Sequence, residues 1–427
     1  MNDEWPTFGN MAAGGSALDS SFSLPRSSFV VFAPNPWHDL WRNRQQIFSR
    51  LAARQHRVLY VEPARASLAD WRRGRVTWQQ VRRPSLVQEL PNLWLYRIPA
   101  LLPTRATGDR FDRASDRLLA IHLRRTIKRL GFLSMPVNHS PFTIHNSQFS
   151  PILWLYRPTR WRWAAANFPR RLLVYHITDD YAAFGHLSDA QRAALLAEER
   201  DLLAAADLTI VTAPRLLELK APFARRIELI PNGVDLVAFQ RAASSPLPSA
   251  PPRLGYSGHV SARLDLPLLC AIALARPDWQ LMFAGSEWDA GCAEDLAALK
   301  ALPNVHFLGL LPVEEVPSFI ARCDVCLIPY RVNDETRAIS SLKLYEYLAA
   351  GRPVVSARVP AAEEHAAVVR MADGTVASWV EQIEAALAQR DDPTQVAARQ
   401  AVAGENTWEE RVERIESLLA DLQRSAA

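Results

Sequence analysis

The sequence predicts an α/β protein in which two Rossmann-like domains face each other across a cleft, with a C-terminal helix returning toward the first domain. Three observations lead to this prediction. Short apolar runs alternate with amphipathic segments, which is typical of parallel sheets covered by helices on both faces. A Pro- and Ser-rich stretch at 239–253, FQRAASSPLPSAPPR, interrupts the alternation, and the pattern then restarts. The length of 427 residues also exceeds that of one ordinary domain.

The first half opens with the apolar run SSFVVFAP at 27–34, which we expect to be a buried parallel strand ended by Pro34. WHDLWRNRQQIFSRLAARQH then has the period of an amphipathic helix, with Ile47, Phe48 and Leu51 on its inner side. The remaining apolar runs of this half are predicted as further strands: RVLYVEP, LWLYRIP, FTIHNS, RLLVYHITDD, LTIVTAP and IELIPNGVD.

The second half repeats the pattern and ends in a helix. Five apolar runs are predicted as strands: LGYSGHV, WQLMFAG, VHFLGLL, CDVCLIPY and RPVVSA. NTWEERVERIESLLADLQ follows as a helix with an apolar stripe at Val412, Ile415 and Leu419. These segments predict the following division of the chain: a lead-in without fixed structure at 1–27, a first domain at 28–236, a linker at 237–253, a second domain at 254–404 and a C-terminal helix at 405–427.

The composition is that of a soluble globular protein, with 49% hydrophobic and 22% charged residues. No stretch approaches the roughly 20 apolar residues that a membrane-spanning helix needs, and the N-terminal segment lacks the apolar core of a secretory signal. Cys323 and Cys326 form a CxxC without a second pair, and strand alternation favours buried reduced thiols over a zinc or redox site. We therefore expect a cytoplasmic protein.

Charge is distributed unevenly between the two halves. Residues 1–235 contain 32 Lys and Arg against 20 Asp and Glu, a net charge of +12, whereas the remainder contains 17 against 25, a net charge of −8. A basic half favours an anionic partner, such as a membrane surface or a lipid-linked phosphate. Alternatively, the arginines only solvate helix faces. No nucleic-acid-binding motif accompanies the charge, so we expect no nucleic-acid partner.

The stretch SSLKLYEYLAAGRPVVSA predicts a helix that begins near Ser340 and ends at a glycine before a buried strand. The unpaired N–H groups of its first turn, the hydroxyls of Ser340 and Ser341 and the charge of Lys343 together favour a bound phosphate. Glu346 lies on the same face as Lys343, and a carboxylate there can accept hydrogen bonds from a ribose diol. The alternative is a solvated Lys–Glu pair on the surface.

Further candidates stand at the ends of predicted strands, where they point into the expected cleft. Gly258 would let the backbone approach a diphosphate, and His259 follows it; an ordinary strand–helix turn is the alternative. His176 ends the strand in RLLVYHITDD, and Asp179 and Asp180 follow on the loop. Any of these three could serve as a general base in transfer to a hydroxyl. The alternative is that at least one of the two acids caps the next helix.

Two side chains directly after the first strand are candidates for binding an acceptor or a diphosphate. Trp37 offers a ring that stacks on sugars, and Arg44 offers a guanidinium that holds phosphate or carboxylate. The ordinary alternative is that Trp41, on the same segment, belongs to the helix core and that Arg44 is solvated.

Several of these motifs resemble GT-B glycosyltransferases of the family 4 type. SSLKLYEYLAAGRPVVSA is similar to the helix of that family's donor site, and LIPNGVD at 229–235 is similar to the end of its first domain. LGYSGHVSARLDLPLL looks like the first strand and turn of the donor domain. VYHITDDYAAF and NPWHDLWRNRQQ resemble a bacterial subgroup that assembles polysaccharides, and the resemblance covers residues 28 to 425.

The resemblance implies roles for single residues. Glu346 matches the second glutamate of the family's E-x7-E motif, which holds the nucleotide ribose. The first glutamate, which contacts the donor sugar, falls at Ala338, so the chain departs from the motif there. Arg263 is a candidate for the family's diphosphate clamp, and His176 matches a histidine near the donor sugar.

The resemblance implies a metal-independent hexosyltransferase that needs no cofactor. It would move a sugar from a nucleotide-diphosphate sugar to a hydroxyl of a lipid-linked or polymeric glycan, in the cytoplasm and at the inner face of the membrane. Two alternatives remain. A nucleotide-sugar 2-epimerase shares the architecture, and a non-catalytic nucleotide-sugar-binding relative is suggested by Ala338.

Overall fold

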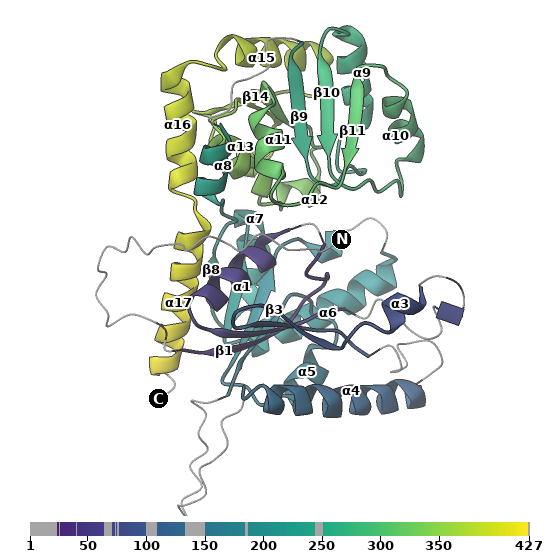
Figure 1. The fold of residues 1–427 in the computed structure, drawn as a ribbon, viewed down its shortest axis with the longest axis vertical. Helices are drawn as coiled ribbons and strands as arrows, with labels where there is room; N and C mark the ends of the chain where they lie inside the picture. The colour runs from purple at the N-terminus through teal and green to yellow at the C-terminus, as the bar shows by residue number, and fades with distance from the viewer. Residues whose placement is uncertain are drawn as a thin grey trace, which may run out of the picture.

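The computed structural model describes residues 24, 26–39, 41–63, 71–72, 74, 77–99, 109–132, 150–183, 187–243 and 251–425. Figure 1 shows two α/β domains, one above the other. The helix α16 (Pro393–Gly404) runs beside the second domain, and α17 (Trp408–Ser425) continues down the side of the first. The chain therefore crosses between the domains twice.

The first domain is built on an eight-stranded sheet in the order β3-β4-β2-β1-β5-β6-β7-β8, parallel except for the β3–β4 pair. Its strands are β1 (Ser28–Phe32), β2 (Arg57–Val61), β3 (Leu86–Leu90), β4 (Leu93–Tyr96), β5 (Ile152–Leu155), β6 (Leu172–Ile177), β7 (Leu208–Val211) and β8 (Ile227–Leu229). Its helices are α1 (Asn43–Ala53), α3 (Trp78–Val81), α4 (Asp109–Arg129), α5 (Trp161–Asn167), η3 (Tyr181–Ala183), α6 (Asp189–Ala205), α7 (Pro214–Lys220) and η4 (Ala221–Phe223).

The second domain contains a six-stranded parallel sheet in the order β11-β10-β9-β12-β13-β14. Its strands are β9 (Arg253–Ser257), β10 (Gln280–Ala284), β11 (Val305–Gly309), β12 (Val325–Ile328), β13 (Val354–Ala357) and β14 (Val369–Ala372). Besides α16, its helices are α8 (Leu236–Ala243), α9 (Leu266–Ala275), α10 (Ala293–Lys300), α11 (Val316–Ala321), α12 (Asp334–Arg337), α13 (Leu342–Ala349), α14 (Pro360–Glu363) and α15 (Val376–Ala388).

The C-terminal helix returns to the first domain, as predicted, and there it completes the hydrophobic core. Trp408, Val412 and Ile415 of α17 are buried in one cluster with Phe29 of β1 and Phe48 of α1. Their spacing of three to four residues places them on one face of the helix. The first domain therefore depends on the last residues of the chain for part of its hydrophobic core.

The structure also differs from the sequence-based expectations. The predicted linker at 237–253 begins instead with α8, because Phe239 packs into the core of the second domain. The predicted lead-in lies almost entirely outside the described residues, and so does the predicted strand FTIHNS. The sequence analysis missed three strands: β3, β5 with the run ILWL, and β14.

Two expectations about chemistry can be compared with the described residues. Cys323 and Cys326 are free, buried thiols, as predicted. Among the helices that the structure describes, none has both the length and the apolar character needed to cross a bilayer.

Candidate functional site

The two domains meet at the carboxyl ends of their sheets, where side chains of the first domain contact side chains of the second. The Nη2 atom of Arg42, which directly precedes α1, is 2.6 Å from His259 Nε2. Asp179 Oδ1, in the loop after β6, lies 3.6 Å from Arg263 Nη2. These contacts bring together three of the predicted residues and one, Arg42, that the sequence analysis did not identify.

Helix α13 begins beside this contact. Its N-cap residue, Ser341, is buried, and its hydroxyl has no hydrogen-bond partner among the described residues. Lys343 donates to the Tyr330 hydroxyl at 2.7 Å and lies 5.1 Å from the ring centroids of Tyr256 and Tyr330. Because the first N–H groups of a helix have no partner within it, an anion at this tip would meet both backbone donors and a cation.

Ser340 ties the start of α13 to the segment that follows β8. Its hydroxyl oxygen accepts a hydrogen bond from the Asn232 backbone N–H at 3.2 Å, and its carbonyl accepts from Asn232 Nδ2 at 2.7 Å. The hydroxyl of Ser340 can still donate its own hydrogen to a ligand.

Glu346 lies one turn into α13, on the same face as Lys343. Its carboxylate has no hydrogen bond or ion pair with any residue that the structure describes. Burial raises the pKa of Glu346 to about 7, although the charge of Lys343 acts in the opposite direction. A half-buried acceptor without a protein partner is suited to a ligand that carries hydroxyl groups.

Two glycines allow close packing of the loops after β9 and β10. Gly258 packs against the side chain of Lys343, and Gly285 packs against the backbone of Gly258. Gly258 has a φ of +127°, and a Cβ there would lie 3.3 Å from Lys343 Cε. Gly285 has a φ of +152°, and its Cβ would lie 2.0 Å from the carbonyl oxygen of Gly258. Only glycine fits such a contact. Gly285 was not identified from the sequence, although WQLMFAG carries the same strand–glycine signal as LGYSG.

The contact between Arg42 and His259 fixes the tautomer of the imidazole. A guanidinium only donates hydrogen bonds, so His259 Nε2 must accept and Nδ1 must carry the hydrogen. Nδ1 donates this hydrogen to Ser286 Oγ, and the two heavy atoms are 2.5 Å apart. Burial, and then the charge of Arg42, lower the pKa of His259, which keeps the ring neutral at pH 7.

Arg263 is held by two carboxylates from different domains. Its Nε donates to Glu335 Oε1 at 2.5 Å, and its Nη2 faces Asp179. Ala338, where the resemblance places a carboxylate, is buried at 1% exposure among apolar side chains of the first domain's core. Glu335, three residues before Ala338, is therefore engaged with Arg263.

Of the three predicted catalytic residues, only Asp179 faces the second domain. Asp180 accepts a hydrogen bond from the buried Lys220 at 3.2 Å, inside the first domain. His176 is 1% exposed and stacks on Tyr156 with ring centroids 5.0 Å apart. Burial lowers the pKa of His176 to about 3. The structure thus argues against His176 and Asp180 as groups that reach a substrate.

Trp37 and Arg44 do not lie where the sequence analysis expected them. Trp37 is 2% exposed and packs edge-on against Tyr60 at 5.1 Å, so it offers no free ring face to a sugar. Arg44 is 3% exposed, with its guanidinium over the ring of Tyr156 at 5.2 Å. Arg44 is therefore neither solvated nor directed at the second domain, and the side chain that reaches across is that of Arg42.

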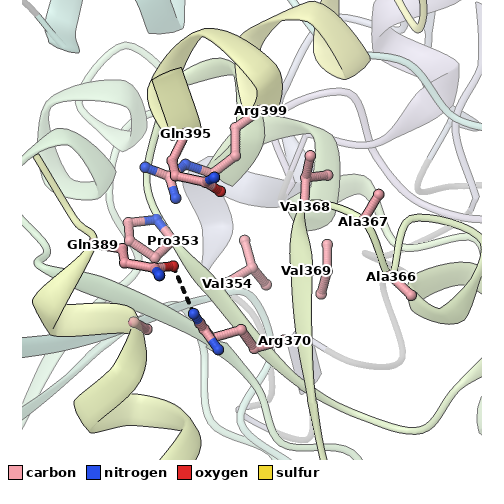
Figure 2. Close-up of a pocket in the computed structure, with 11 residues that line it drawn as sticks. Pro353, Val354, Ala366, Ala367, Val368, Val369, Arg370, Gln389, Gln395 and Arg399 are labelled. Carbon is pink, nitrogen blue, oxygen red and sulfur yellow. Dashed lines mark hydrogen bonds between the residues drawn. The ribbon is translucent and has the colours of Figure 1, made fainter. Parts of the chain in front are cut away.

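The cavity in Figure 2 is separate from this site. It has a volume of about 240 Å³ and lies at the amino ends of β13 and β14, the opposite edge of the second sheet. Arg370 donates to Gln389 in its wall at 2.6 Å. In the part of the chain that the structure describes, no group of three or more His, Cys, Asp or Glu side chains could hold a metal ion.

Comparison with known proteins adds family evidence. Residues 252–389 match the model of the family described as "Glycosyl transferases group 1". The putative teichuronic acid biosynthesis glycosyltransferase TuaH of Bacillus subtilis (strain 168) is 28% identical over 191 residues. This alignment covers 43% of the chain and 48% of TuaH, so the match spans about half the length of that relative.

Solved structures resemble nearly the whole chain. Sucrose-phosphate synthase from Thermosynechococcus elongatus has a TM-score of 0.68 and 18% identity, covering 94% of this chain and 100% of its own. Anabaena HepE, in complex with UDP and glucose, has a TM-score of 0.62 and 14% identity, covering 92% and 100%. Residues 252–389 are thus similar to the group 1 glycosyltransferases, and the two domains together have the GT-B fold.

Proposed function

We propose that the protein is a hexosyltransferase that moves a sugar from a nucleotide-diphosphate sugar to a hydroxyl of a lipid-linked or polymeric glycan. The family of residues 252–389 and the name of the relative TuaH support transfer to a polysaccharide. The observation that carries the proposal is the tip of α13, where the backbone N–H groups of the first turn and Lys343 lie near the carboxylate of Glu346, which has no partner among the described residues.

In this proposal the donor lies along α13. Its diphosphate would take the N–H groups of the first turn, the hydroxyls of Ser340 and Ser341 and the charge of Lys343. The glycine at 258 leaves room for the backbone to approach it. Glu346 would accept hydrogen bonds from the two ribose hydroxyls.

The chemistry would consist of positioning and of stabilising the departing diphosphate. Arg263 and Lys343 are the cations that would balance the charge that builds up on that group, and we propose that no metal ion and no cofactor are required. Asp179 is the carboxylate that could accept the proton of the acceptor hydroxyl, because of the two acids after β6 it is Asp179 that faces the second domain.

We also propose that the enzyme works in the cytoplasm, at the inner face of the membrane. A lipid-linked acceptor would be held there, and the net charge of +12 over residues 1–235 would favour an anionic surface.

Calorimetric titration with UDP-, GDP- and dTDP-linked hexoses tests the donor site. We expect one nucleotide to bind, and we expect Glu346→Gln to weaken it by about tenfold or more, since hydrogen bonds to a charged group are lost. Glu381→Gln is the matched control, because that exposed acid of α15 lies outside the site. Equal donor affinities of wild type and Glu346→Gln would contradict the proposal that Glu346 binds the ribose.

A non-catalytic relative that binds the donor is the second candidate, favoured by the burial of Ala338. Incubation of the donor with membrane-extracted lipid-linked glycans distinguishes the two. Transfer of a labelled sugar supports the enzyme, whereas donor binding without transfer supports the binding protein. An epimer formed in the absence of acceptor would indicate the epimerase instead.

A further inference from the structure

Helix α4 (Asp109–Arg129) lies along the outer side of the first domain, away from the second domain (Figure 1). Its inner side packs on the sheet, and Leu119, Leu123 and Ile127 are buried there at 5% exposure or less. The spacing of three and four residues explains why these side chains share one face. The opposite face of α4 is therefore turned to solvent.

That opposite face is both apolar and basic. Leu118 and Ile121 are 50% and 45% exposed, although large aliphatic side chains are usually covered. The cations around them are also exposed, and none has an ion-pair partner among the described residues: Arg117, Arg125, Lys128 and Arg129. We call these six residues the outward face of α4. Among the described side chains of α4, the acid Asp116 forms an ion pair with Arg160 of the neighbouring loop.

We propose that the outward face of α4 docks the protein on an anionic lipid bilayer. The helix would lie parallel to the membrane, with Leu118 and Ile121 at the boundary between headgroups and acyl chains. The four cations would face lipid phosphates, to which basic residues near a surface are attracted. The proposal rests on the proposed function, in which the enzyme works at a membrane, and it specifies which surface faces that membrane. Because α4 lies away from the second domain, the contact region between the domains stays open to a donor (Figure 1).

The mixture of side chains favours a bilayer over a nucleic acid. A phosphodiester backbone would pair with the cations, but it offers nothing apolar to Leu118 and Ile121, which lie between them. A bilayer interface satisfies both kinds of side chain at once. Binding to the membrane should therefore depend on the apolar pair as well as on the charges.

Sedimentation with vesicles tests the surface on the full chain. Vesicles of phosphatidylcholine with 30% phosphatidylglycerol should bind the protein, pure phosphatidylcholine should bind it weakly, and added salt should release it. Lys128→Gln/Arg129→Gln should weaken binding by roughly 25-fold, at about fivefold for each cation. Leu118→Ser/Ile121→Ser should weaken it by about tenfold, at the salt concentration at which wild type still binds.

Matched controls lie on the second domain. Arg241→Gln/Arg322→Gln removes two exposed cations, and Val237→Ser/Leu274→Ser removes two exposed aliphatic side chains, at 59% and 67% exposure. Both controls should bind vesicles as wild type does. Equal losses in the controls and the α4 variants, or tighter binding to duplex RNA than to the vesicles, would overturn the proposal. Donor titration is independent of lipid, so failure of the donor site would be recognised separately.

Discussion

Glu346→Gln should make the free protein more stable while it weakens donor binding. The carboxylate of Glu346 is half-buried and has no hydrogen-bond partner among the described residues, so its charged form is disfavoured when no ligand is present. Glutamine keeps the shape of the side chain and removes the charge. A residue that costs stability and has no structural partner is expected at a ligand site.

The magnitude follows from the pKa of Glu346. The difference between its ordinary value of 4.5 and its value of about 7 in the folded protein corresponds to about 3 kcal/mol. Because the side chain keeps partial contact with solvent, we expect a gain of about 2 kcal/mol in the variant. For a domain of this size, that amounts to a rise of about 4 to 8 °C in Tm.

The difference in stability between wild type and Glu346→Gln should depend on pH. Between pH 4.5 and 7 the folded protein binds more protons at Glu346 than the unfolded chain does, so wild type loses stability relative to the variant as pH rises through this window. The difference should be largest at pH 8 and absent at pH 4. Thermal melts of wild type, Glu346→Gln and the control Glu381→Gln measure it. A Tm for Glu346→Gln that is equal to or below that of wild type at pH 8 would refute the reasoning.

Three further predictions concern the site and the fold. Gly285→Ala should destabilise the second domain by about 3 kcal/mol or more and abolish donor binding, because its Cβ would lie 2.0 Å from the Gly258 carbonyl oxygen; an unchanged Tm contradicts this. Asp179→Asn should slow transfer by about 100-fold, while its donor affinity stays within about threefold of that of wild type. Asp180→Asn should instead lower Tm, since it leaves the buried Lys220 with one carboxylate fewer. The reverse pattern would exchange the roles of the two acids. Trp408→Ala should destabilise the first domain by about 3 to 5 kcal/mol, as urea unfolding followed by the fluorescence of the remaining tryptophans would show; an unchanged unfolding midpoint contradicts this.

The fold could be predicted because alternating apolar runs and amphipathic segments are local signals. The same signal missed ILWL, a run of four apolar residues that forms the buried strand β5, whereas the predicted strand FTIHNS lies outside the described residues. It also missed α8, because a single turn of apolar spacing at Leu236 and Phe239 precedes a Pro- and Ser-rich stretch. Where the local sequence supports two structures equally, tertiary packing determines which of them forms.

The site could be predicted only in part, because the type of a residue does not reveal its depth. Glu346 and Lys343 stand on one helix, so their spacing predicts that they act together. Trp37 and His176 stand at the correct ends of strands, yet both are turned into the core of the first domain. Arg42 was missed for the opposite reason, since its partner lies 217 positions away and no local pattern joins them.

The cations of the site all have partners before a donor arrives. Lys343 donates to a tyrosine, Arg42 to His259, and Arg263 to carboxylates of both domains. A diphosphate must replace these contacts, so the net gain from each cation is the difference between two charge-assisted interactions. Glu346 has no such contact to give up. Its hydrogen bonds to a ribose would therefore replace only hydrogen bonds to water, which is why substitution of Glu346 should weaken donor binding more than substitution of any one cation.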